Sequence, residues 1–221
     1  MLPTIRDHDP LDLNKPLLRG YFHLAAAFLA AAGSVALILL ADSPRALVGG
    51  GVFALSLVAL YAVSATYHTI NWGDRARSIL RRVDHSMIFV LIAGSYTPFC
   101  LLVLSGALGI AMLAVVWAVA AAGIVMKILW PAAPRWLSVA LYLAAGWIAL
   151  VAASELASWF ALVPLLMLAG GGVLYSLGGV IYAVRRPNPF PRVFGYHEVF
   201  HLLVIGGSVL HYSLVANYLM R

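Results

Sequence analysis

Residues 195–201, with the sequence GYHEVFH, open an apolar run that continues to about residue 219. A run of this length can cross a bilayer as a helix. His197 and His201 are four residues apart, so both imidazoles lie on one face of that helix, a spacing suited to metal binding. An ionisable side chain within a membrane span is a candidate functional residue by default. Other spans must supply the groups that meet these two histidines.

The composition of the chain identifies it as a membrane protein. Of its 221 residues, 63% are hydrophobic and only 10% are charged, whereas soluble domains carry about 25% charged residues. A soluble core of this size could not bury so much apolar surface, so lipid must cover it. The apolar runs are continuous rather than alternating, which excludes the strands of a membrane barrel. The expected fold class is therefore an all-α, polytopic membrane protein.

Seven apolar runs are each about long enough to span the hydrocarbon core. They cover residues 21–41, 47–68, 83–104, 108–129, 136–153, 160–184 and 196–219. Between them, the arginine-rich stretch 71–82 is expected to form a polar loop and residues 154–158 a short turn. The predicted organisation is a polar cytoplasmic N-terminal tail, residues 1–20, followed by one seven-helix transmembrane domain, residues 21–221. The first span would serve as an uncleaved anchor.

Lysine and arginine in short loops predict the orientation, because they favour the cytoplasmic side of a membrane. With seven spans, only Arg45 and Arg221 fall opposite the N-terminus. The other basic residues share its side: Arg6, Lys15, Arg19, Arg75, Arg77, Arg81, Arg82, Lys127, Arg135, Arg185, Arg186 and Arg192. We therefore expect the N-terminus inside and the C-terminus outside. The net charge of +6 is a topology signal and does not indicate nucleic-acid binding.

Several polar side chains that are remote in sequence share one depth in this topology. His68 ends the second span, Asp84 begins the third, and His197 and His201 begin the seventh, all at the inner side. Helical bundles build metal sites from inward-facing side chains of several helices in this way. His68 is thus the best third ligand, and Ser64 lies one turn from it on the same face.

Three neutral histidines suit Zn²⁺, with water completing a tetrahedral site, and zinc lowers the pKa of such water to about 7. Asp84 would act on that water as a general base or orient a histidine. Its contact with the metal could be direct or through water. The Ser64 hydroxyl could bond to the water or to a substrate carbonyl. A dry pocket between apolar helices favours lipid substrates.

Other polar residues of the spans have simpler interpretations. His23, His85 and His211 are expected to be interfacial polar residues. Glu198 is expected to be a carboxylate favoured by the dipole at the start of a helix. Residues 197–201 also match H-E-x-x-H, in which the glutamate is the general base of a metalloprotease. An intramembrane metalloprotease is therefore an alternative function.

Several motifs together resemble the haemolysin III family, the bacterial branch of the progestin and adipoQ receptor (PAQR) superfamily. They are S-x-x-Y-H at residues 64–68, Asp84-His85 followed by LIAGSYTPF at 91–99, and H-x-x-x-H at 197–201 with a later His211-Tyr212. The segment PLLRG at residues 16–20, with His23, is similar to the family's N-terminal part. The resemblance covers nearly the whole chain.

The resemblance implies a seven-helix fold with the N-terminus inside, a zinc ion inside the membrane, and a location in a bacterial inner membrane. By this resemblance, the metal ligands would be His68, His197 and His201. Asp84 would bind a water molecule, and Ser64 would lie near that water. The superfamily is also similar to alkaline ceramidases, which implies hydrolysis of a lipid amide.

The expected function is that of a zinc-dependent hydrolase acting on membrane lipids with a sphingolipid-like or acyl-amide-like structure. One alternative is a non-enzymatic lipid sensor, receptor-like or membrane-homeostasis protein in which zinc is structural. A pore-forming cytolysin has less support, because the sequence contains no amphipathic pore-forming segment. Nothing in the sequence specifies an oligomeric state.

Overall fold

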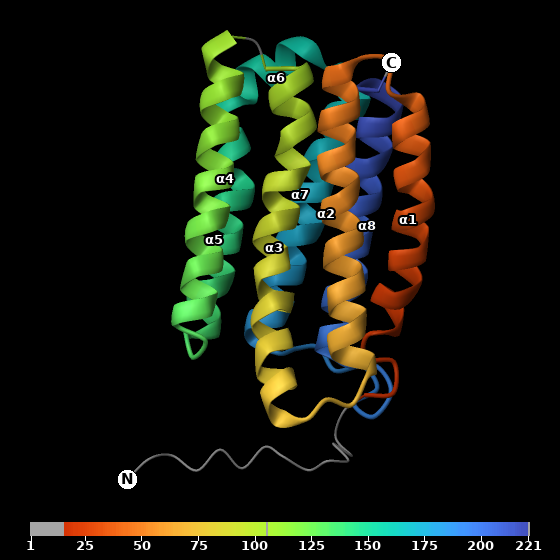
Figure 1. Ribbon diagram of the computed structural model, residues 1–221, viewed down its shortest axis with the longest axis vertical. Coiled ribbons are helices and arrows are strands. Elements are labelled where there is room, and N and C mark those ends of the chain that lie inside the picture. Colours follow the sequence, from red (N-terminus) through yellow and green to blue (C-terminus); the bar gives the residue numbers. More distant parts are fainter. Residues whose placement is uncertain (1–15, 105, 221) are drawn as a thin grey trace.

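A computed structural model describes residues 16–104 and 106–220 of the chain (Figure 1). The predicted N-terminal tail up to residue 15, Ser105 and Arg221 lie outside the described residues. Within these two ranges the secondary structure is helical, apart from one isolated β-bridge between Phe190 and Phe194. Seven helices are long and apolar enough to cross a membrane. The all-α, seven-span fold class is therefore confirmed, whereas the orientation of the termini stays a prediction.

The elements follow one another in an up-and-down order. They are α1 (Tyr21–Leu40), α2 (Pro44–Thr69), α3 (Asp74–Leu102), α4 (Gly106–Leu129), α5 (Arg135–Gly146), η1 (Trp147–Ala152), α6 (Ala153–Trp159), α7 (Leu162–Val184) and α8 (Tyr196–Tyr218). Five of the seven spans begin and end within about three residues of the predicted positions, the usual uncertainty of helix boundaries. The third and fifth spans differ more.

The prediction of a polar loop at 71–82 is wrong for most of these residues, because α3 begins at Asp74. The arginines that follow are good helix formers, and an acid in the first turn is favoured by the helix dipole. At 29 residues, α3 is about 44 Å long and exceeds the hydrocarbon core. Its first turns therefore extend beyond the other helices (Figure 1), where long basic side chains can reach water.

The fifth span is not one uniform helix. It runs as α5, then the 3₁₀ segment η1, then α6, so the turn predicted at 154–158 is helical. The hydroxyl of Tyr96 on α3 explains the break. It accepts a hydrogen bond from the Ala149 N–H (2.8 Å) and donates one to the Gly146 carbonyl (2.6 Å). The tyrosine thus satisfies backbone groups that the change of helix type frees, as a membrane interior requires.

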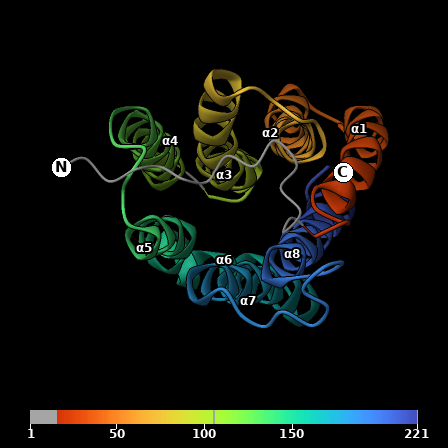
Figure 2. The same ribbon diagram turned by 90° about the horizontal axis from the view of Figure 1, so that it is seen from below.

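The seven spans form a ring. Each helix packs against its neighbour in chain order, with α5 contacting α7 and α8 closing the ring against α1, as the view along the bundle shows (Figure 2). The outer faces remain apolar, and Phe28, Leu29 and Leu39 are 72%, 73% and 80% exposed. Such faces are suited to lipid. The interior of the ring is the place where polar side chains from different helices meet.

The chain before α1 is attached to the loop before α8. The N–H groups of Leu17 and Leu18 donate to the carbonyls of Arg192 and Val193, at 3.0 and 3.1 Å. This pairing fixes the first turns of α1 and α8 beside each other. It therefore holds His23 near the start of α8, where the sequence motif H-x-x-x-H lies.

Candidate metal centre

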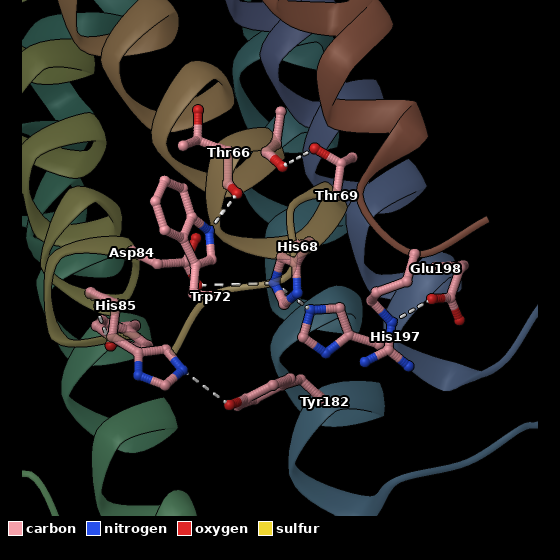
Figure 3. A network of polar contacts seen from close by, with 12 residues as sticks. Thr66, His68, Thr69, Trp72, Asp84, His85, Tyr182, His197 and Glu198 are labelled. Carbon is pink, nitrogen blue, oxygen red and sulfur yellow. Dashed lines mark hydrogen bonds and ion pairs between the residues drawn. The ribbon is translucent and has the colours of Figure 1, made fainter. Parts of the chain in front are cut away.

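The end of α2 and the start of α8 bring three histidines together. His68, His197 and His201 offer ligand nitrogens that all lie within 4.8 Å of one another. The Nε2 atoms of His68 and His197 are 3.2 Å apart, and Figure 3 shows the two rings turned toward each other. All three side chains are buried, and His201 is only 1% exposed. The three residues that the sequence suggested as metal ligands thus form one compact buried group.

The spacing of these nitrogens fits a tetrahedral metal ion. With Zn–N bonds of about 2.0–2.1 Å, two ligand nitrogens of a tetrahedral site lie about 3.3 Å apart, close to the 3.2 Å between His68 and His197. His201 Nδ1 is buried without a hydrogen-bond partner among the described residues. Imidazole nitrogens suit zinc, copper, iron and nickel. The donor set therefore fits a transition metal without identifying it.

Asp84 and Ser64 lie at the same end of the bundle as the histidines. Asp84 Oδ2 is 3.8 Å from His68 Nε2, too far for a direct hydrogen bond but close enough for one atom to lie between them. The Ser64 hydroxyl interacts with the Asp84 carboxylate as a hydrogen-bond partner. Asp84 is thus positioned to act on a group held by the histidines, with Ser64 orienting its carboxylate.

Glu198 lies between the two histidines of α8 in sequence but serves another purpose. Its Oε2 accepts a hydrogen bond from the Gly195 N–H (2.7 Å), and Oε1 is ion-paired with Arg19. Figure 3 shows this carboxylate on the far side of His197 from His68. Both oxygens are therefore engaged at the helix start, as expected for a carboxylate that satisfies N-terminal backbone groups. This arrangement argues against Glu198 as a general base.

The expectation that His23, His85 and His211 are interfacial is wrong for two of them. His23 is 3% exposed and His211 8% exposed, because His23 packs against α8, whereas the His211 ring packs against α7 and contacts the Leu168 carbonyl at 3.1 Å. His23 stacks on His201 with ring centroids 3.6 Å apart. His85 is half-buried and contacts the Tyr182 hydroxyl through Nε2 at 3.1 Å. The sequence indicated where these residues lie along their helices, but not whether that face of the helix points toward the interior of the ring.

Gly20 is a residue that the sequence motifs did not single out for a role at the site. Its φ is +88°, and a Cβ there would lie 2.6 Å from the Cβ of His68. Glycine adopts this backbone conformation without steric cost. The signals in the sequence were its position directly before the first span and its place in the PLLRG segment. The close approach means that the segment before α1 supports one of the candidate ligands.

We expect Gly20→Ala to lower both stability and metal content. A non-glycine residue with this left-handed backbone costs about 1–3 kcal/mol, and relief of the clash would displace His68. Thermal unfolding and elemental analysis of the purified protein measure the two effects. Gly51→Ala is the matched control, since a Cβ inside α2 at that position meets nothing within 4 Å. Equal metal content and melting temperature in both variants would contradict this role.

A cavity of about 380 Å³ occupies the interior of the ring. Ser64, Asp84, His197 and His201 line the end of the cavity next to the candidate metal ligands, and it reaches Leu156 in α6 at the opposite end of the bundle. Between these ends most of the lining side chains are apolar, including Leu91, Ile92, Phe99, Met112, Leu165 and Val204. This volume falls within the range of small-molecule sites, and its shape and lining suit an acyl chain.

Comparison with known proteins agrees with this architecture. The profile of the family described as "Haemolysin-III related" matches residues 11–212. The chain belongs to the haemolysin III family. It is 36% identical to a "Hemolysin-3 homolog" of Bacillus subtilis (strain 168) over 170 residues, which cover 77% of this chain and 76% of that protein.

Two further relatives support the placement of this haemolysin III family member. "Hemolysin-3" of Bacillus cereus is 34% identical over 175 residues, covering 79% of this chain and 77% of that protein. A "Heptahelical transmembrane protein ADIPOR2" of Oryza sativa subsp. japonica is 29% identical over 182 residues, covering 74% and 79%. The predicted membership of the haemolysin III family and the wider PAQR superfamily is therefore confirmed, as is a multi-pass membrane protein.

Proposed function

We propose that this haemolysin III protein is a zinc-dependent hydrolase of a lipid amide, resident in a bacterial inner membrane. One observation carries the proposal: a buried group of three histidines meets Asp84 and Ser64 at the inner end of a mainly apolar cavity. A metal donor set, a carboxylate and a hydroxyl next to a channel for a hydrocarbon chain are the parts that amide hydrolysis requires.

His68, His197 and His201 would hold the zinc ion. When bound, zinc supplies a Lewis acid and lowers the pKa of water, so that hydroxide becomes available near neutral pH. The cavity would place the amide carbonyl beside the histidines and direct the acyl chain toward α6. Its apolar walls exclude bulk water, which strengthens electrostatic interactions at this end.

Asp84 would accept the proton of the water that adds to the amide carbon, then deliver it to the departing amine nitrogen. The C–N bond breaks, and the products are a fatty acid and an amine. The Ser64 hydroxyl would donate to Asp84 before the reaction and could donate to the carbonyl oxygen as negative charge develops there. Each of these steps uses a side chain that lines the cavity.

A second candidate function is a lipid sensor in which the metal is structural. It is favoured by the position of the histidines, because α2 and α8 are separated by α1 in the ring. A metal ion held by His68 and His197 would link two helices that are not neighbours in the ring. In that case the cavity would bind a lipid without changing it, and Asp84 would serve only to orient His68.

Release of fatty acid distinguishes the two functions. Purified protein in neutral phosphatidylcholine vesicles would be incubated with ceramides of several chain lengths, with and without prior removal of metal by a chelator. We expect fatty acid release that disappears on chelation and returns with Zn²⁺. Background release from a folded, zinc-loaded protein would contradict hydrolysis and favour the sensor.

A further inference from the structure

Two cations contact tyrosines of the cavity wall, outside the histidine site: Lys127 lies over the Tyr142 ring and Arg135 over the Tyr182 ring. Arg81 on α3, Lys127 on α4 and Arg135 on α5 all lie within electrostatic range of His85. We call these three residues the basic inner rim. They come from consecutive helices of the ring (Figure 2). None of the three forms an ion pair with a carboxylate in the part of the chain that the structure describes.

Lys127 is the unusual member of the rim, because it is a buried cation. Its side chain is only 7% exposed, and its ammonium group donates to the Ser138 hydroxyl and lies 5.7 Å from the centre of the Tyr142 ring. Burial of a charge is expensive unless an opposite charge compensates it. A hydroxyl and an aromatic face compensate only in part. The positive-inside rule accounts for exposed loop cations but not for this buried one.

Aromatic side chains hold the rim against the cavity wall. The Arg135 guanidinium lies 4.8 Å from the centre of the Tyr182 ring and contacts the Tyr182 carbonyl. The Tyr142 hydroxyl donates to the His85 carbonyl at 3.0 Å. Figure 3 shows His85 and Tyr182 joined by their contact at the inner end of the bundle. His85, Tyr142 and Tyr182 line the same cavity as Asp84. The rim therefore lies directly behind the cavity wall, at the same end as the metal centre.

We infer that the basic inner rim binds a phosphate group carried by the lipid whose acyl chain occupies the cavity. Arginine, lysine and tyrosine are the donors that recognise phosphate in proteins. Phosphate would compensate Lys127 and the two arginines at once. This inference rests on the proposed function and specifies its substrate class: a lipid amide whose amine half ends in an anionic phosphate close to the scissile bond.

A binding experiment tests the rim independently of catalysis. Zinc-loaded protein in neutral phosphatidylcholine nanodiscs would be titrated with a fluorescent ceramide phosphate, with the matching neutral ceramide, and with inorganic phosphate as competitor. We expect the wild type to bind ceramide phosphate at least tenfold more tightly than ceramide, with a difference that shrinks as salt is added. Fatty acid release from ceramide, measured on the same samples, reports separately on hydrolysis.

Matched variants locate the effect. Arg81→Gln combined with Arg135→Gln should lose most of the preference for ceramide phosphate while binding ceramide as before. Arg75→Gln, at an exposed position nearer the start of α3, should keep it. The comparison of the two lipids on the wild type needs no variant, so a failure of the double variant to fold leaves the test intact.

Three outcomes would overturn the inference. Equal affinity of the wild type for ceramide and ceramide phosphate would contradict the phosphate site without contradicting the proposed hydrolysis. An equal loss in Arg75→Gln would assign the effect to diffuse surface charge. Inorganic phosphate that competes as strongly as ceramide phosphate would place the ligand in solution and not in a lipid.

Discussion

Asp84→Asn should abolish amide hydrolysis while the protein keeps its fold and its metal. Asparagine has nearly the same shape but cannot take a proton, and general acid–base catalysis contributes about 10²–10⁴-fold to a rate. The carboxylate lies 3.8 Å from His68 Nε2, so its loss removes no direct hydrogen bond to a candidate ligand. We expect fatty acid release from ceramide to fall by at least 100-fold, measured per mole of zinc-loaded protein.

Glu198→Gln is the control that separates the lipid hydrolase from a metalloprotease. Glutamine can still accept the Gly195 N–H but loses the ion pair with Arg19, so the protein should be less stable. Its turnover per folded, metal-loaded molecule should stay within a few-fold of the wild type. Full activity in Asp84→Asn, together with an inactive but folded Glu198→Gln, would reverse the assignment of the base.

His201→Ala should remove the metal and much of the stability that it supplies. His201 is almost fully buried among the other two candidate ligands, and two imidazoles bind zinc far less tightly than three. A metal present at 1,000 times its dissociation constant stabilises the folded state by about 4 kcal/mol. We therefore expect a large fall in melting temperature and less than a tenth of the wild-type metal by elemental analysis.

His85→Gln is the matched control for metal loss. His85 is a half-buried histidine at the same end of the bundle, but its ring contacts Tyr182 and not the other histidines. The metal content of this variant should equal that of the wild type. Stoichiometric metal retained in His201→Ala, or lost equally in His85→Gln, would contradict the three-histidine site.

The composition and the local pattern of this chain determined most of its architecture. Apolar length and the placement of lysine and arginine are local properties, so seven spans could be recognised without knowledge of how they pack. Because successive spans run in opposite directions, their order then predicted the side of the membrane on which each polar residue lies. His68, Asp84 and His197 were thereby expected near one another although they are remote in sequence.

Packing of the ring decided what depth alone could not. A helix has several faces, and only the contacts of α1 and α8 with their neighbours turned His23 and His211 inward. The start of α3 at Asp74 was missed because hydropathy indicates only which residues lie within the lipid. A helix continues beyond the lipid wherever its residues have sufficient helix propensity.

The break in the fifth span depended on Tyr96, a partner 53 residues away from Ala149. The same holds for Glu198, whose Oε1 is paired with Arg19 from near the opposite end of the chain. The sequence by itself thus determined the membrane class, the number of spans and the end of the bundle at which the candidate site residues lie. Only the tertiary structure decided which side chains meet there, because hydrogen bonds and ring contacts across helices depend on rotations that no local pattern specifies.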